Sequence, residues 1–140
     1  MICSSTHAQK LPPNEQLKLE TLHFYNNMSG DDGCVAWARI ISRCSSLVDV
    51  RFSGTRASRV GSLAASKALS GNASLGGVRR LDLADNTFGG EGGIRLCEAI
   101  GRMQELESVD LRDCSMEDEG IKVSYNRLNG SNRFPSFLVH

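Results

Sequence analysis

Cysteines, histidines and a glycine cluster are the residues of this sequence whose spacing could reveal chemistry. The five cysteines form no C-x-x-C pair, so the sequence predicts no metal site. His7, His23 and His140 are far apart in sequence, and none stands with a nucleophile and a third orienting group. The glycines of residues 89–93 could cradle a phosphate, but no Lys-Ser or Lys-Thr pair follows them as in a P-loop. The sequence therefore predicts neither an enzyme nor a cofactor.

Charged residues are segregated along the 140-residue chain, although the formal net charge is zero. Residues 39–80 carry a net charge of +7, whereas residues 81–120 carry −8. The neutral total disfavours nucleic acid as a partner. No stretch approaches the roughly 20 apolar residues of a membrane helix, so no membrane insertion is predicted. The N-terminus lacks the pattern of a signal peptide, and we expect a cytoplasmic protein with free thiols.

The elements that position these residues follow from an apolar pattern that occurs four times. Each copy has apolar residues at positions i, i+3 and i+5 and a small residue at i+8. The copies begin at Leu19, Leu47, Val78 and Leu106, with steps of 28, 31 and 28 residues. The alternation predicts short strands, each with one buried face, centred on residues 22–24, 50–52, 81–83 and 109–111.

The second half of each copy predicts a helix. Gly33, Gly61 and Gly92 share one column, each opening a helix that carries an apolar stripe. Trp37 lies on this stripe and is expected in the core. A single strand–turn–helix unit cannot bury its own apolar face, so the units must stack. The predicted fold class is α/β, a right-handed solenoid of about four repeats with parallel strands on the concave side and helices on the convex side.

The small residue at i+8 ends each strand and is expected to turn inward and satisfy backbone groups that the turn leaves unpaired. These structural ladder residues are Asn27, Thr55, Asn86 and Cys114.

The ends of the chain are less regular, and we divide it into three parts. Residues 1–16 are expected to be a flexible lead-in, residues 17–123 the repeats, and residues 124–140 an irregular C-terminal tail. The apolar pattern decays after Gly120, where no further helix is expected. An open apolar edge beside Leu111 and Met116 follows from this expectation.

Strand alternation places a set of charges on the concave face. One column reads His23, Arg51, Asp82 and Asp110, and the column three residues along reads Asn26, Gly54, Asp85 and Asp113. Asp82, Asp85, Asp110 and Asp113 are the candidate partner-binding residues, with Arg51, Arg80 and Arg112 beside them. Two interpretations stay open. The face is a solvated surface, partly neutralised by Arg80 and Arg112, or it docks a basic protein surface.

Three strings of the sequence resemble the leucine-rich repeats of Ran GTPase-activating proteins, particularly the plant type. They run from Leu22 to Gly33, from Leu81 to Gly93 and from Val109 to Gly120. The resemblance covers roughly residues 17–122. It implies repeats of the ribonuclease-inhibitor-like subclass and a Ran-type small GTPase as partner.

In that family the repeats stimulate GTP hydrolysis by Ran, in nucleocytoplasmic transport and in part at the nuclear envelope. The early repeats that hold the family's functional asparagine have no counterpart here, so we expect this chain to bind without activating. The alternative is a generic leucine-rich-repeat scaffold, as in an immune receptor or a ubiquitin-ligase adaptor.

Overall fold

A computed structural model describes residues 15–71, 77–129 and 136–138 of the chain. Its five strands form one sheet in sequence order, and all neighbouring strands are parallel. The strands are β1 (Thr21–Tyr25), β2 (Asp49–Ser53), β3 (Arg80–Asp82), β4 (Ser108–Asp110) and β5 (Ser136–Leu138). The first four lie where the sequence predicts them.

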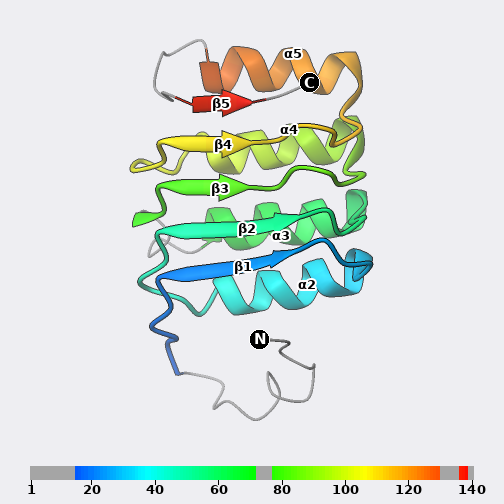
Figure 1. The fold of residues 1–140 in the computed structure, drawn as a ribbon. Helices are drawn as coiled ribbons and strands as arrows, with labels where there is room; N and C mark the ends of the chain where they lie inside the picture. Colours follow the sequence, from blue (N-terminus) through cyan, green and yellow to red (C-terminus); the bar gives the residue numbers. More distant parts are fainter. Residues whose placement is uncertain (1–14, 72–76, 130–135, 139–140) are drawn as a thin grey trace.

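Helices alternate with the strands and cover one side of the sheet. They are α2 (Gly30–Ile41), α3 (Arg59–Gly71), α4 (Gly89–Ile100) and α5 (Glu117–Ser124), and α5 continues into the π-helix η2 (Tyr125–Asn129). Figure 1 shows the strands in front and the helices behind, with each unit stacked on the one before it along a right-handed path. The predicted α/β solenoid is confirmed.

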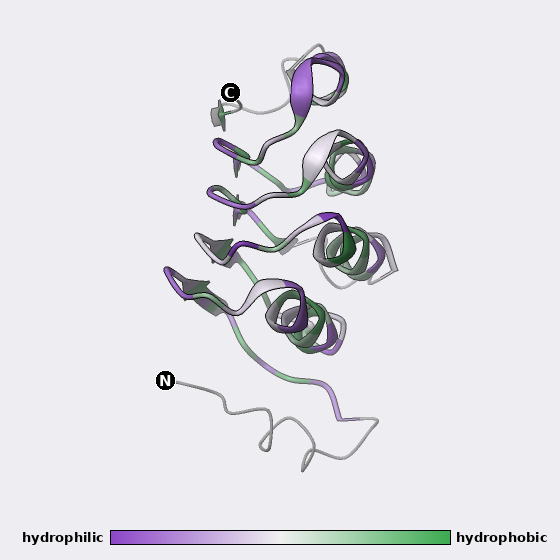
Figure 2. Cartoon of the chain, turned by 90° about the vertical axis from the view of Figure 1, so that its right-hand side faces the viewer, coloured by the Kyte–Doolittle hydropathy of each residue, from purple (hydrophilic) through white to green (hydrophobic). Residues whose placement is uncertain are grey.

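The core lies between the sheet and the helices, where the apolar residues of both layers meet (Figure 2). Phe52 of β2 is fully buried and stacks on Phe24, with ring centroids 5.7 Å apart. Trp37 of α2 packs against the same ring at 5.2 Å and is 3% exposed, which confirms its predicted place in the core. Burying a side chain of this size contributes about 1.5–3 kcal/mol before the entropy of ordering is subtracted.

A left-handed residue follows each of the first four strands. Asn26, Gly54, Asp85 and Asp113 have φ angles of 52°, 64°, 55° and 53°. Glycine, asparagine and aspartate adopt this conformation at lower cost than other residues. The backbone therefore accounts for the residue types in this column, of which the sequence had suggested Asp85 and Asp113 only as partner-binding charges.

Asn86 is the centre of the inward hydrogen-bond ladder. Its Oδ1 accepts from Thr55 Oγ1 at 2.8 Å and from the Ala57 backbone N–H at 3.0 Å. Its Nδ2 donates to the carbonyl oxygens of Phe52, Leu83 and Ala84. Cys114 Sγ, one repeat further on, donates to the Leu83 carbonyl at 3.2 Å. The ladder thus joins three successive repeats through buried side chains.

Asn27 occupies the same position in the first repeat but is only half-buried. Its Oδ1 accepts from the Ser29 backbone N–H at 3.0 Å, and its Nδ2 donates to the Tyr25 carbonyl at 3.5 Å. Both side-chain bonds stay within the first repeat.

The glycine column has a different role from the predicted one. The helices begin at Gly30, Arg59 and Gly89, so Gly61 and its equivalents lie inside the first turn and do not open a helix. A Cβ at Gly61 would stand 2.8 Å from Asp31 Oδ1 and 2.9 Å from the Cβ of Cys34. The missing side chain therefore lets α3 approach α2 closely.

Asp31, in the first turn of α2, caps the next helix. Its Oδ1 accepts from the backbone N–H groups of Ser58 and Gly61 at 2.7 and 2.8 Å, and its Oδ2 accepts from Ser58 Oγ at 2.6 Å. Partial burial raises the pKa of Asp31, but these hydrogen bonds outweigh it and hold the pKa below its ordinary value. One repeat thus supplies the N-terminal cap of the following one.

The expectation of no helix after Gly120 is wrong. α5 and η2 carry the chain to Asn129, and β5 adds a strand beside β4, with the Leu111 N–H donating to the Leu138 carbonyl at 2.8 Å. The predicted apolar edge is covered, because Leu111 is fully buried and Met116 is 3% exposed. Of the predicted flexible lead-in, residues 1–16, positions 1–14 lie outside the described residues.

Candidate functional site

Two rows of side chains cross the concave face of the sheet. Strand register places His23, Arg51, Asp82 and Asp110 side by side in one row. Two residues earlier on each strand, the second row reads Thr21, Asp49, Arg80 and Ser108. Side chains two apart on a strand point to the same face, so both rows turn away from the core. Charges of both signs thus face each other between β2 and β3, whereas β3 and β4 bring Asp82 beside Asp110.

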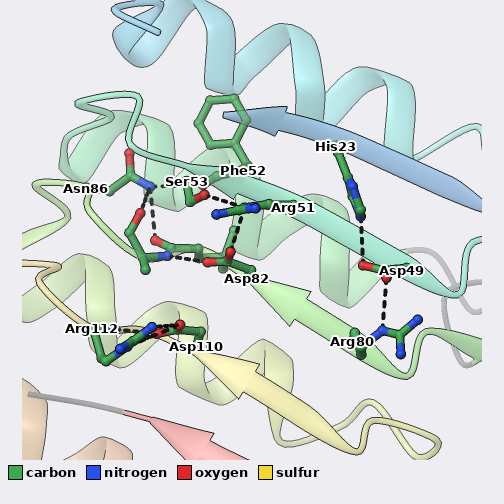
Figure 3. A network of polar contacts seen from close by, with 12 residues as sticks. His23, Asp49, Arg51, Phe52, Ser53, Arg80, Asp82, Asn86, Asp110 and Arg112 are labelled. Carbon is green, nitrogen blue, oxygen red and sulfur yellow. Dashed lines mark hydrogen bonds and ion pairs between the residues drawn. The ribbon is translucent and has the colours of Figure 1, made fainter. Parts of the chain in front are cut away.

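Asp49 bonds to one side chain on each neighbouring strand (Figure 3). Its Oδ1 lies 2.9 Å from His23 Nε2, and its Oδ2 lies 2.9 Å from Arg80 Nε. Partial burial raises the pKa of Asp49, but the bonds from His23 and Arg80 outweigh it and hold the pKa below its ordinary value. The carboxylate therefore ties β1 to β2 and β2 to β3.

Arg51 makes a second cross-strand link. Its Nε lies 2.7 Å from Asp82 Oδ2 and donates to Ser53 Oγ at 2.8 Å. The guanidinium also lies over the ring of Tyr25, with its central carbon 4.3 Å from the ring centroid. This cation–π contact fixes the arginine against β1.

Asp110 is held from its own segment by Arg112. The Nη2 of Arg112 lies 2.6 Å from Asp110 Oδ2, and its Nε donates to Oδ1 at 3.0 Å. This bidentate bond raises the pKa of Arg112 above its ordinary value. The acidic group at this end of the row is thus already engaged.

The structure separates the four candidate aspartates into two pairs. Asp82 and Asp110 lie on the sheet face, each in an ion pair. Asp85 and Asp113 lie on the turns beyond the strands, are exposed, and make no side-chain hydrogen bond or ion pair with any described residue. Arg80, expected to neutralise these aspartates, bonds to Asp49 instead.

A hollow of about 300 Å³ lies between the rows. Its lining comprises His23, Asp49, Arg51, Arg80, Leu81, Asp82, Ser108, Asp110 and Leu138. Sequence reasoning missed Asp49 and Ser108, because it followed the row of Arg51 and the turn column but not the row two residues earlier. The same alternation, applied once more, would have found both.

The cysteines offer no reactive thiol among the residues that the structure describes. Cys34, Cys44, Cys97 and Cys114 are buried and form no disulfide. Burial raises the pKa of Cys34 and of Cys114 to about 12. A thiol with so high a pKa forms too little thiolate near neutral pH to act as a nucleophile.

Within the described ranges, no group of three or more His, Cys, Asp and Glu side chains is arranged to hold a metal ion. No helix of this part of the chain has the length and apolar character needed to span a membrane.

Comparisons with known proteins agree with this architecture. A family model described as "Leucine Rich repeat" matches residues 78–97 and 103–123. The chain folds as a leucine-rich-repeat solenoid. Among solved structures, this solenoid is similar to one titled "Leiomodin-1 Actin-Binding Site 2 (ABS2)", with a TM-score of 0.72 over 86% of this chain and 70% of that chain. The two sequences are 14% identical, so the likeness concerns the fold. No curated protein matches the sequence.

Proposed function

We propose that this leucine-rich-repeat solenoid is a protein-binding module whose partner docks on the concave face and on the turns that follow the strands. The observation that carries the proposal is the continuous row of polar and charged side chains across β1 to β4. These side chains are held in place by ion pairs before any partner arrives. Charges of both signs that are already fixed in place determine how a partner aligns on the surface. They raise the association rate more than they raise the affinity.

A Ran-type small GTPase is the specific partner that we propose. Its support is the resemblance of three repeat strings to Ran GTPase-activating proteins, together with the exposed carboxylates of Asp85 and Asp113. These two groups are free to meet basic residues of a partner, whereas Asp82 and Asp110 are engaged. Because a GTPase carries its own catalytic machinery, the module would position it without chemistry of its own. We expect binding with little acceleration of GTP hydrolysis by this chain alone.

A pull-down with GTP-loaded Ran at low and at moderate salt tests this function. Binding should weaken as salt rises, because the screening length shortens to about 8 Å near physiological ionic strength. The double variant Asp85→Asn and Asp113→Asn keeps residues that tolerate the left-handed turn and removes both charges. It should bind roughly fivefold more weakly, while the control Glu105→Gln, an exposed carboxylate between α4 and β4, should bind as wild type.

Three outcomes would contradict parts of the proposal. Failure of wild type to retain GTP-loaded Ran at low salt would remove this GTPase and favour the generic scaffold. Equal binding by the double variant would show that the turns take no part. A large acceleration in a single-turnover hydrolysis assay would overturn the expectation of binding alone. Actin is included as a second bait, because the similar solved structure is titled as an actin-binding site.

A further inference from the structure

The helices α2 and α3 lie next to each other on the side of the solenoid away from the strands (Figure 2), and a groove of about 520 Å³ is formed between them. Its floor is apolar and is made of small side chains. Ala38 and Ala68 are buried there, while Val35 and Ala64 are half-buried. The groove can therefore receive an apolar side chain from outside the chain.

Two cations stand at the rim of this groove. Arg39 of α2 and Lys67 of α3 are 28 residues apart, the spacing of Gly33 and Gly61, so they occupy the same position in successive repeats. Both are exposed, and neither side chain makes a hydrogen bond or ion pair with any described residue. None of the described residues that line the groove is acidic, and α3 contains no acidic residue. The rim thus carries two positive charges without a counter-charge in the groove.

The next helix, α4, shows how the same positions are filled one repeat further along. There the place of Ala64 is held by Arg95, and the place of Lys67 by Glu98. Arg95 Nη1 lies 3.3 Å from Glu98 Oε2, so a cation and a carboxylate neutralise each other within the helix. The groove between α2 and α3 has alanine and an unpaired lysine at these positions, so its matching carboxylate has to come from another molecule.

We propose that this groove docks an acidic amphipathic segment of a partner protein, whose apolar side chains fill the floor and whose carboxylates meet Arg39 and Lys67. Protein interfaces commonly combine an apolar centre with a polar rim. An amphipathic helix laid in a groove presents both along one face. The groove lies on the opposite side of the solenoid from the concave face, so this inference goes beyond the function proposed above and does not depend on it.

The chemistry of the groove suits a peptide better than a nucleic acid or a lipid surface. Binding along a phosphate backbone uses a stripe of many basic residues, and adsorption to anionic lipid uses a cluster of them. The groove has two cations beside a floor of alanine and valine. A segment in which glutamate flanks leucine uses both of these features.

The test is an NMR titration of the full chain with the blocked peptide Glu-Leu-Glu-Glu-Leu-Leu-Glu-Glu, whose leucines share one helical face. Two related peptides serve as controls, one with serine at every leucine and one with lysine at every glutamate. An oligothymidylate of similar charge is a third control. The parent peptide should shift the backbone amides of α2 and α3 and leave those of the strands unchanged. All three controls should bind at least about tenfold more weakly.

Variants of the groove locate the binding site. Arg39→Gln and Lys67→Gln should each weaken binding of the parent peptide about threefold, because each removes one exposed ion pair. Ala64→Glu should weaken it about tenfold, because it places a carboxylate in the floor. Arg102→Gln is the matched control, since Arg102 is exposed, follows α4 and does not line the groove. It should bind as wild type does, and circular dichroism and urea midpoints should show that all variants are folded.

Four results would overturn the proposal. They are equal binding of the serine peptide, tighter binding of the lysine peptide or the oligothymidylate, equal weakening by Arg102→Gln and Lys67→Gln, and shifts confined to the strands. The last of these would place the peptide on the concave face. No measurement contains Ran, so failure here and failure of the proposed function are separable.

Discussion

Aspartate serves two different purposes in two adjoining regions of this solenoid, the concave strand face and the turn that follows it. On the strand face, Asp82 bonds across the sheet to Arg51, so its charge is matched by a neighbour. Three residues later Asp85 is exposed, without a side-chain partner among the described residues, at a φ of 55°. Two aspartates in aligned columns therefore need not form one site. Pairing with Arg51 explains the aspartate at residue 82, whereas the left-handed backbone explains the aspartate at residue 85.

The largest loss of folding stability is expected on substitution of Asn86, in the turn that follows β3. Asn86→Ala removes five buried hydrogen bonds and leaves several backbone groups unpaired, so it should lower the free energy of unfolding by about 3 kcal/mol. Urea unfolding followed by Trp37 fluorescence measures it. Asn27→Ala, at the half-buried equivalent, should cost less than half as much. Equal losses at the two sites would mean that the ladder does not stabilise through its links between repeats.

A crossed pair of substitutions sharpens the comparison between turn and strand. At Asp85, alanine should destabilise by about 1 kcal/mol because it resists the left-handed region, whereas glycine should be nearly neutral. At Asp82 the order should reverse, since glycine in a strand costs more than alanine. Denaturant midpoints of the four variants provide the measurement. If alanine were better than glycine at both positions, the turn conformation would not explain the choice of aspartate at residue 85.

The smallest effect concerns the pH dependence contributed by the strand face. The folded pKa of Asp49 lies below its ordinary value of 3.8, so its contribution is fully present above that value and is lost as pH falls through the folded pKa. The difference in unfolding free energy between wild type and Asp49→Asn should therefore shrink as the pH falls below about 4. Added salt should reduce it, because both partners of Asp49 are partly exposed. A difference that grows as the pH falls would contradict the pairing.

Most of the fold could be predicted because apolar residues at a fixed spacing mark the strands. Alternation such as Leu81 and Leu83 places the strands, and the period places the helices, so the parallel solenoid follows from stacking alone. The fourth helix was missed because polar residues replace apolar ones along its stripe. In α4 the buried positions include Gly93 and Leu96, and their equivalents in α5 are Ile121 and the buried Ser124.

The concave face was predicted as a set of residues but not as a set of bonds. Alternation showed that Arg51 and Asp82 share a face, yet which cation meets which carboxylate depends on distances across strands. Asp49 was overlooked because it lies in the row two residues before Arg51, although it forms two of the contacts. Arg51 and Arg80 both bond through Nε to described residues, and only the structure shows which of their nitrogens make these contacts.

Asp31 of α2 caps the following helix, α3. One repeat of the sequence is therefore not a structural unit that can be transferred to another protein on its own. A repeat excised at its sequence borders would leave behind the carboxylate that satisfies its first amides, at Ser58 and Gly61. The same holds at the other end of the array, where Ser124 of α5 contacts Cys97 Sγ of α4 at 2.9 Å. A graft of the repeat that contains α3 should therefore keep its stability best when the first turn of α2, with Asp31, is transferred together with it.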